Sequence, residues 1–458
     1  MKMNPHIFRE YDIRGVAEMD FDKEFATTLA RAVATHGAKY GAKKLTVGRD
    51  CRLTSDGYAD AVMEGFAKCG IEAVDIGVCP TPVFYYSVIN LEADGGIMIT
   101  ASHNPSDQNG FKIHLGGGTI YGDEILEVKG VIEAGKFIDG KGSRGSADVL
   151  TPYKKFMAEN IKLDRGVKIA IDAGNGTAGP VAPEVLRDLG CTVRELFCDM
   201  DGRFPNHHPD PTVPDNVTDL IAAVRSGSLE AGIGFDGDSD RIGVIDDQGK
   251  LLYGDRLLAL FAREVLSRKP GATVIGEVKC SRVLFDDIKA HGGNPIMWKA
   301  GHSLIKAKMK EVDAELAGEM SGHMFFKDRF FGYDDAIYAA CRLVEILSKT
   351  DEPLSELLSD LPETYTTPEI RVEIPDEIKF DVVALAQKHF AQKNETIDVD
   401  GVRILFDDGA WGLIRASNTQ PALVLRFEAD THERLDEVRS HIEAELAELR
   451  KEVEEGRA

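Results

Sequence analysis

The chain has 458 residues, 43% of them hydrophobic, and is therefore long enough for about three or four folded domains. Its net charge of −23 argues against non-specific binding to nucleic acid, because that binding needs an excess of lysine and arginine. The 7 cysteines are scattered and never spaced Cys-x-x-Cys, which argues against a disulfide framework or a zinc site. No apolar run approaches the roughly 18 residues of a membrane span, and residues 1–14 contain no apolar stretch of the kind found in secretory leaders. We therefore expect a soluble cytoplasmic protein without a membrane partner.

Three segments of the chain open with the same pattern, which predicts a repeated α/β unit. Each begins with a short β-rich run that ends in a glycine or acidic turn, followed by a helical pattern and later by a second apolar run. The opening runs are residues 44–50, 167–172 and 272–277. The second runs are residues 96–99, 231–235 and 314–317. Each second run leads into a polar loop, so we expect the three units to contribute one functional loop each from equivalent positions.

The first of these loops, residues 100–105, carries Ser102 and His103. Asn104 precedes Pro105, and a residue before proline is pushed out of the helical region, so the loop ends the apolar run as a turn. Ser102 is therefore expected at the end of a strand, where active sites of open α/β sheets lie. From these residues alone, a capping or turn serine remains the alternative to a reactive one.

The second loop, residues 236–241, has Asp236, Asp238 and Asp240 at alternate positions. Three carboxylates repel one another unless a cation holds them, and this density of hard oxygen ligands suits Mg²⁺. The alternative is a solvated acidic turn. A calcium-binding EF-hand loop is excluded because Arg241 stands at the sixth position, which that loop reserves for glycine.

The third loop, residues 318–323, places Glu319, Ser321 and His323 two residues apart. The carboxylate accepts hydrogen bonds and the hydroxyl donates or accepts them, so the pair suits the vicinal hydroxyls of a sugar. The imidazole adds a group that titrates near neutral pH. A polar turn between two strands is the alternative.

A fourth polar loop, residues 415–421, brings together Arg415, Ser417, Asn418 and Thr419. A guanidinium matches phosphate oxygens, and hydroxyls together with loop amides complete an anion-binding nest. We predict a phosphate-binding loop here, with a plain Ser/Asn turn as the alternative.

Together, the four loops resemble those of the α-D-phosphohexomutase superfamily, in its phosphomannomutase/phosphoglucomutase branch. Four further stretches fit in the family's order, at residues 11–15, 109–112, 278–282 and 299–303. The resemblance implies an α/β fold of three related α/β domains with mixed sheets plus a smaller C-terminal α+β domain, arranged around a central cleft. Ser239 departs from the pattern, because the family's metal loop often has glycine at this position. Met320 favours the mannose/glucose branch over the glucosamine branch.

The resemblance and the local composition predict four domains. They are residues 1–149 with the phosphoserine, 150–249 with the metal site, 250–364 with the sugar site and 365–458 with the phosphate site. The boundaries follow the Gly/Ser-rich residues 141–148, a turn at residues 246–249 and a proline-bounded stretch at residues 362–368. The tail at residues 431–455 has the pattern of a charged amphipathic helix.

The resemblance also implies an activity, reversible intramolecular phosphoryl transfer between the 1- and 6-positions of hexose phosphates, with mannose or glucose or both as the sugar. Ser102 would carry the phosphoryl group, Mg²⁺ would be the cofactor, and a hexose 1,6-bisphosphate such as glucose 1,6-bisphosphate would be intermediate and primer. A phosphoglucosamine mutase and a Mg²⁺-dependent sugar phosphatase are the alternative enzymes, and an inactive sugar-phosphate-binding protein is the alternative from another class. Hexose phosphates are the expected partners, and the chain is expected to be a monomer or a weak homodimer.

The site residues fall into three groups by predicted role. The predicted catalytic residues are Ser102, His103, Lys112, Arg14, Arg241 and His323. The predicted substrate-binding residues are Tyr11, Lys279, His302, Glu319, Ser321, Arg415, Ser417, Asn418 and Thr419. The predicted metal ligands are Ser102, Asp236, Asp238 and Asp240. Because an acidic chain must still bind an anionic substrate, the cleft must be locally positive. The candidates for this charge are Arg14, Lys112, Arg241, Lys279, His302, Arg415 and Arg426.

The variants Lys112→Ala and His323→Ala test whether these side chains take part in proton transfer or stabilise charge in the transition state. We expect each substitution to lower turnover by about 10²–10⁴-fold, the typical contribution of a general acid or base, while sugar phosphate still binds. Steady-state turnover and sugar-phosphate titration measure the two effects separately. Unchanged turnover in both variants would remove these residues from the chemistry.

Overall fold

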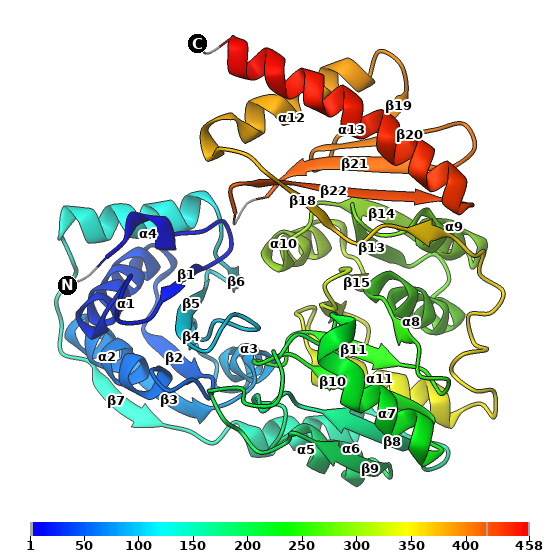
Figure 1. The fold of residues 1–458 in the computed structure, drawn as a ribbon. Helices are drawn as coiled ribbons and strands as arrows, with labels where there is room; N and C mark the ends of the chain where they lie inside the picture. Colours follow the sequence, from blue (N-terminus) through cyan, green and yellow to red (C-terminus); the bar gives the residue numbers. More distant parts are fainter. Residues whose placement is uncertain (1–2, 418–419, 457–458) are drawn as a thin grey trace.

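The computed structural model describes residues 3–417 and 420–456, and these form four successive units of sheet and helix (Figure 1). The first unit, coloured blue to cyan, lies at one side, and the fourth, coloured orange to red, lies across the top of the view. Short 3₁₀ turns occur at Pro5–Ile7, Ala38–Tyr40 and Pro214–Val217. Within the part of the chain that is described, no helix is both long and apolar enough to cross a membrane.

The first unit is a mixed sheet with the strand order β1-β5-β4-β2-β3-β7, and β6 pairs with β5. Its strands are β1 (Ile13–Val16), β2 (Lys44–Arg49), β3 (Glu72–Val78), β4 (Gly95–Ile99), β5 (Gln108–Leu115), β6 (Gly118–Thr119) and β7 (Ser143–Ser146). Its helices are α1 (Lys23–Gly37), α2 (Ser55–Lys68), α3 (Thr81–Asn90) and α4 (Asp123–Ala134). Side chains alternate along β4, so Ile97 and Ile99 pack with α1, α2 and α4, whereas Met98 packs with α3 in a core shared with the next two units.

The second and third units have smaller mixed sheets, with the strand orders β12-β11-β10-β8-β9 and β14-β13-β15-β16. The second contains α5 (Leu150–Asn160), β8 (Lys168–Asp172), α6 (Ala182–Asp188), β9 (Thr192–Leu196), α7 (Thr218–Gly227), β10 (Ala231–Phe235), β11 (Ile242–Ile245) and β12 (Leu251–Leu252). The third contains α8 (Gly254–Arg268), β13 (Thr273–Glu277), α9 (Arg282–Ala290), β14 (Asn294–Trp298), α10 (His302–Val312), β15 (Leu316–Gly318), β16 (Met324–Phe326) and α11 (Ala336–Ser348).

The three units share one topology, which confirms the predicted repeat. In each, the strand before the functional loop pairs in parallel with the opening strand and antiparallel with the strand that follows the loop. These strands are β4 between β2 and β5, β10 between β8 and β11, and β15 between β13 and β16. The loops that carry Ser102, the three aspartates and Glu319 therefore occupy equivalent positions.

The Gly/Ser-rich residues 141–148 do not form a plain linker. Ser143–Ser146 is the edge strand β7, which pairs in parallel with β3 over Glu72–Asp75. All four residues of β7 are exposed, so the strand is held by backbone hydrogen bonds and has no apolar alternation that would reveal it in the sequence.

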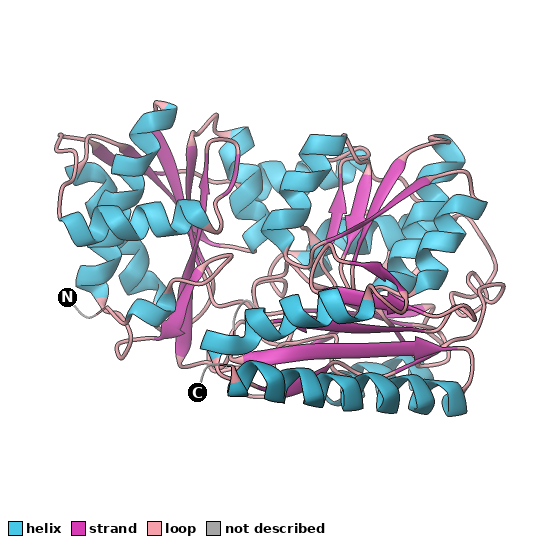
Figure 2. Cartoon of the chain, turned by 90° about the horizontal axis from the view of Figure 1, so that it is seen from above, coloured by secondary structure: helices cyan, strands magenta, loops and turns pink. Residues whose placement is uncertain are grey.

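The fourth unit is an antiparallel sheet covered on one face by two helices, which lie along the strands in Figure 2. Its elements are β17 (Tyr365–Thr366), β18 (Ile370–Glu373), α12 (Asp376–Phe390), β19 (Glu395–Ile397), β20 (Val402–Leu405), β21 (Trp411–Ala416), β22 (Ala422–Ala429) and α13 (His432–Glu455). The Thr431 hydroxyl caps α13 by accepting a hydrogen bond from Arg434 N. One face of α13 is buried and the other is charged, as the amphipathic pattern predicted.

The fourth unit packs on the third through one face of β21, because side chains along this strand alternate between two faces. Ile414 and Ala416 pack beneath α12 and α13, whereas Trp411 and Leu413 point the other way and contact Val278. The guanidinium of Arg403 lies 3.6 Å from the ring centre of Trp411. It also donates hydrogen bonds to the carbonyls of Val278 and Cys280 at 2.8 and 2.7 Å. A buried aromatic ring and a buried cation thus join the two units.

Replacing Trp411 by alanine should loosen this junction. We expect Trp411→Ala to destabilise the protein by about 3–5 kcal/mol, because it leaves a cavity and removes the ring beneath the guanidinium of Arg403. Thermal unfolding measures the effect, and Phe380→Ala, which removes an aromatic ring that is 57% exposed in the same unit, is the matched control. Equal melting temperatures for the two variants would contradict the expectation.

Candidate active site

All four units contribute side chains to one central cleft with a volume of about 630 Å³. The first unit contributes Tyr11, Arg14 and His103, the second Arg241, the third Lys279, His302, Glu319, Ser321 and His323, and the fourth Arg415 and Ser417. Residues from distant parts of the sequence thus meet at one place, as the four loops predicted. Asn418 and Thr419 lie outside the described residues.

Ser102 is buried in the loop after β4, next to His103, which lines the cleft. Its backbone adopts φ of 51°, in the left-handed region that side chains other than glycine rarely adopt. The Ser102 hydroxyl donates a hydrogen bond to Asp236 Oδ2 at 2.6 Å and lies 3.1 Å from His103 Nδ1. The serine oxygen therefore faces the aspartate loop across the boundary between the first and second units.

His103 and Arg14 lie beside Ser102 and face the cleft. Arg14 contacts Asp12 Oδ2 at 2.5 Å and Asn104 Oδ1 at 2.8 Å, so its guanidinium is fixed at the edge of the serine loop. Burial lowers the pKa of His103 well below its ordinary value, and the charges of Arg241 and Arg14 lower it further. A neutral imidazole and a fixed cation thus lie next to the serine.

Asp236, Asp238 and Asp240 form a buried group whose carboxylate oxygens lie within 4.8 Å of one another. Burial raises the pKa of Asp236 well above its usual range, and the carboxylates of Asp240 and Asp238 raise it further. Asp238 Oδ1 is buried without a hydrogen-bond partner among the described residues. Crowded carboxylates and an unpaired oxygen are what a hard divalent cation would stabilise, so these residues could hold a metal ion.

Lys112 lies beneath the aspartates rather than in the cleft. Its Nζ lies 2.8 Å from Asp238 Oδ2 and also contacts Asp240. Burial would lower the pKa of Lys112, but the two carboxylates outweigh it and raise the pKa well above its ordinary value. The hydroxyls of Thr81 and Thr100 donate to the same Asp238 oxygen at 2.6 and 3.1 Å. The first unit therefore binds one oxygen of Asp238 and leaves the other unpaired.

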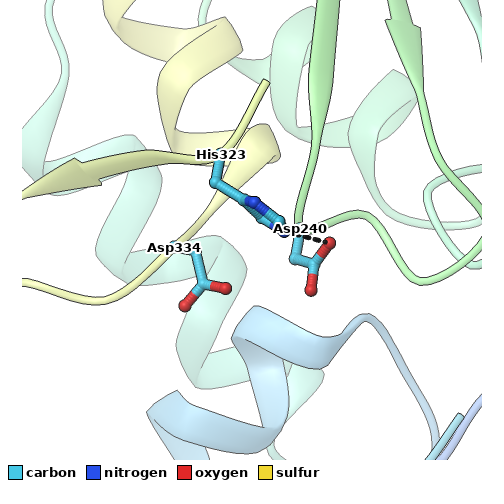
Figure 3. A group of neighbouring side chains, drawn as sticks. All are labelled: Asp240, His323 and Asp334. Atoms are coloured by element: carbon cyan, nitrogen blue, oxygen red, sulfur yellow. Dashed lines mark ion pairs between the residues drawn. The ribbon is translucent and has the colours of Figure 1, made fainter. Parts of the chain in front are cut away.

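A second group that could bind a metal consists of Asp240, His323 and Asp334 (Figure 3). In Figure 3 the imidazole of His323 is directed at Asp240, and its Nε2 lies 3.2 Å from Asp240 Oδ1. Asp334 accepts a hydrogen bond from Lys306 Nζ at 2.8 Å. The first group offers three carboxylates, whereas the second offers two carboxylates and a histidine that would have to lose its proton to bind a metal, so the three aspartates are the better metal site.

The third loop is tied to the second by backbone and side-chain contacts. Arg241 and His323 form a β-bridge, and Ile242 N donates to Gly322 O at 3.0 Å. His323 Nδ1 lies 2.9 Å from Glu319 Oε2. Burial would lower the pKa of His323, but the carboxylates of Asp240 and Glu319 outweigh it and raise the pKa to about 9. His323 therefore carries its proton at neutral pH and links the aspartates to the loop of Glu319.

The remaining substrate-binding candidates line the cleft around the third loop. Lys279 Nζ lies 3.1 Å from Glu369, and Arg415 Nε lies 3.0 Å from Asp400 Oδ2. Tyr11 donates from its hydroxyl to the carbonyl of Ala300 at 2.9 Å. These contacts hold the polar groups in place at the rim of the cleft.

Comparison with known proteins identifies the family. The chain matches the four successive domains of the phosphoglucomutase/phosphomannomutase family, the alpha/beta/alpha domains I, II and III over residues 5–139, 151–249 and 253–365, and the C-terminal domain over residues 369–445. The chain belongs to this family. It is therefore an enzyme of the isomerase class that moves a phosphoryl group within its substrate, and the resemblance found in the sequence is confirmed.

Relatives from three bacteria match over nearly the whole chain. A phosphomannomutase/phosphoglucomutase of Pseudomonas aeruginosa is 46% identical over 436 residues, 95% of this chain and 94% of the relative. A phosphoglucomutase of Neisseria meningitidis is 46% identical over 444 residues, 96% of each chain. The crystal structure of a phosphoglucomutase/phosphomannomutase family protein from Burkholderia thailandensis superposes with a TM-score of 0.93 at 41% identity, covering 98% of both chains.

The structure explains the departure at Ser239. Its φ is 64°, in the left-handed region where glycine has no steric cost, which accounts for the glycine that the family often has there. The Ser239 hydroxyl lies 3.0 Å from the hydroxyl of Thr177, so a side-chain hydrogen bond accompanies the strained backbone. The substitution leaves all three aspartates in the loop.

Two of the seven cations proposed for the cleft do not line it. Lys112 lies under the aspartates, and Arg426 is buried in β22. Two other arginines, Arg9 and Arg371, line the cleft and were not predicted from the sequence. Neither arginine belongs to one of the four polar loops from which the site was predicted.

Two further residues at the site, Thr81 and Glu369, were not predicted from the sequence. Thr81 begins α3, far along the chain from the Asp238 that it contacts. The charge of Lys279 lowers the pKa of Glu369 to about 2, which keeps this carboxylate ionised within the cleft. No local pattern around either residue indicates these contacts.

Magnesium should stabilise the protein through the three aspartates. At a concentration 100 times its dissociation constant, a ligand of the folded state stabilises it by about 2.7 kcal/mol, which thermal unfolding detects as a higher melting temperature. We expect Asp238→Asn to abolish this increase, because it removes the charge of the unpaired ligand oxygen. Asp334→Asn, in the second group, is the matched control and should keep it. Loss of the increase in Asp334→Asn alone would place the ion in the second group.

Proposed function

We propose that the protein interconverts the 1- and 6-phosphates of mannose, glucose or both by phosphoryl transfer through Ser102 and a hexose 1,6-bisphosphate. The observation that carries the proposal is the contact of the Ser102 hydroxyl with Asp236, next to His103 and Arg241 of a cleft to which all four units contribute. No Gly-x-Ser-x-Gly elbow surrounds Ser102, so the serine is not built as the nucleophile of an α/β-hydrolase. A serine next to a carboxylate cluster instead suits a phosphoryl carrier.

Asp236, Asp238, Asp240 and Ser102 would hold Mg²⁺. When bound there, the ion supplies positive charge that stabilises the oxygens of the transferring phosphoryl group. Lys112 holds two of the aspartates from below, which keeps their carboxylates ionised and oriented before the ion arrives. The protein thus preorganises the site on its own residues.

The reaction consists of two phosphoryl transfers, the first from Ser102 to the sugar and the second from the sugar to Ser102. In the first, a hydroxyl oxygen of the sugar phosphate attacks the phosphorus on Ser102, the new O–P bond forms, the Ser102 Oγ–P bond breaks and the hydroxyl proton leaves to a base. The Ser102 oxygen takes up a proton as it leaves. The product is the 1,6-bisphosphate. In the second, Ser102 Oγ gives up this proton and attacks the other phosphate of the bisphosphate, the O–P bond to the sugar breaks and the sugar oxygen takes up a proton, which restores the phosphoserine and leaves the isomeric monophosphate. No water is consumed.

The bisphosphate must turn over between the two transfers, so one set of side chains has to bind the sugar in two orientations. Glu319 and Ser321 offer an acceptor and a hydroxyl to the ring hydroxyls in either orientation. Arg415 and Ser417 line the cleft where they can hold the phosphate that is not reacting, together with Asn418 and Thr419 in our assignment. The cleft of about 630 Å³ lies within the range of about 300–1,000 Å³ typical of ligand pockets.

The side chains around Ser102 differ in their proposed roles: histidines in proton transfer and arginines in stabilising the charge of the phosphate. His103 Nδ1 lies 3.1 Å from the serine oxygen, within hydrogen-bond reach of a proton that moves there. His323 carries a proton near Asp240 and Glu319 and is placed to donate one. Arg14 and Arg241 face the cleft and provide cationic hydrogen-bond donors for phosphate oxygens.

A coupled assay of glucose 1-phosphate and mannose 1-phosphate conversion tests the proposal. The reactions contain Mg²⁺, with and without a trace of glucose 1,6-bisphosphate, and use the natural chain, Ser102→Ala and the control Ser106→Ala. We expect conversion that the bisphosphate increases, that Ser102→Ala abolishes and that Ser106→Ala keeps, because Ser106 is an exposed residue of the same segment. Steady release of inorganic phosphate without isomerisation would identify a phosphatase instead.

A further inference from the structure

Arg52 is a buried arginine behind the serine loop that contacts neither the cleft nor the aspartates. Its side chain is fully buried, and its guanidinium donates hydrogen bonds to four backbone carbonyls of the segment that carries Ser102. The acceptors are the carbonyls of Ser102 at 2.8 Å, Asn104 at 2.6 Å, Pro105 at 2.6 Å and Gln108 at 3.0 Å. One side chain therefore binds the backbone within the serine loop and at the start of β5.

The serine loop needs such a partner because its own backbone is strained and turned inward. Ser102 adopts a positive φ, and strained residues persist when the surrounding structure determines their conformation. Arg52 supplies hydrogen bonds to the carbonyls of Ser102 and Asn104 within the loop, whereas the Pro105 carbonyl also accepts from Gln108 N at 3.0 Å. A guanidinium suits the task, since it offers five N–H donors in a rigid plane, whereas a lysine offers three from a single atom.

Arg52 is itself fixed from two sides. Asp50 accepts hydrogen bonds from Arg52 N at 2.9 Å and from Arg52 Nε at 3.1 Å, and from the hydroxyl of Ser55 at 2.6 Å. The ring of Phe204, from the second unit, lies under the guanidinium with its centre 5.0 Å from Cζ. Gly202 packs so closely that a Cβ there would lie 2.7 Å from Arg52 Cα. The arginine thus bridges the serine loop and the unit that holds the aspartates.

We propose that Arg52 is a positioning residue for phosphoryl transfer, which holds the serine loop in the conformation that directs Ser102 Oγ at Asp236. The inference rests on the proposed function, because it gives Arg52 the task of aiming the residue that carries the phosphoryl group. Arg52 does not contact the sugar site, so its contribution belongs to the transfer step and leaves substrate binding unchanged. A misplacement of about 1 Å at a reacting atom can cost about 10²-fold in rate.

The test separates the transfer step from binding in Arg52→Lys, Arg52→Ala and the natural chain. Intact-protein mass spectrometry follows the phosphorylation of dephosphorylated Ser102 by glucose 1,6-bisphosphate, and calorimetry gives the dissociation constant of glucose 1-phosphate. For Arg52→Lys we expect phosphorylation about 10²-fold slower with an unchanged dissociation constant. In Arg52→Ala, millimolar guanidinium chloride, far below denaturing concentrations, should restore part of the rate.

Arg342→Lys is the matched control for a loss of folding stability. Arg342 is equally buried, donates to the carbonyl of Asp328 and to two carboxylates, and lies in α11 outside the cleft lining. Measured below the melting temperature of every variant, Arg342→Lys should keep the natural phosphorylation rate. An unchanged rate in Arg52→Lys, or a rate loss equal to that of Arg342→Lys, overturns the inference. No phosphorylation in the natural chain would overturn the proposed function itself.

Discussion

Three carboxylates excluded from solvent determine how this molecule is assembled. Asp236, Asp238 and Asp240 belong to the second unit, but Asp238 and Asp240 form ion pairs with side chains of its neighbours. Lys112 and two threonine hydroxyls reach them from the first unit, and His323 reaches them from the third. An ion pair that loses one partner inside a protein leaves an uncompensated charge, which is strongly destabilising. The three α/β units therefore depend on one another at the point where their functional loops meet.

This dependence explains why the chemistry is divided among the units. Each unit alone presents a polar loop at the end of a strand, and none of these loops holds a complete set of groups. The serine needs the aspartates, the aspartates need Lys112, and His323 connects both to the loop of Glu319. The fourth unit then closes the arrangement through the buried pair of Arg403 and Trp411, which fixes the segment of Lys279 against β21.

The sequence predicted what depends on local pattern. Apolar runs located β4, β10 and β15, and the polar motifs directly after them identified Ser102, the aspartates and Glu319. It did not predict partners set by pairing between distant strands. Lys112 faces the aspartates because β5 returns antiparallel to β4, and that register is a property of the folded sheet. The edge strand β7 and the scaffold of Arg52 were missed for the same reason, since both are defined by backbone groups of other segments.

The hairpin that joins β4 to β5 has a consequence for how the serine loop can change. Met98 lies opposite Lys112 in this pair, and side chains alternate between the two faces of a strand. A residue inserted into β5 ahead of Lys112 would therefore turn the ammonium to the opposite face, where the helices α1, α2 and α4 pack, and would bring an apolar side chain to the aspartates. A substitution within the loop changes one contact. An insertion that shifts the register of β5 instead replaces the ammonium of Lys112 next to the aspartates by an apolar side chain. The spacing between Ser102 and Lys112 is thus a structural constant of the site, independent of which residues fill it.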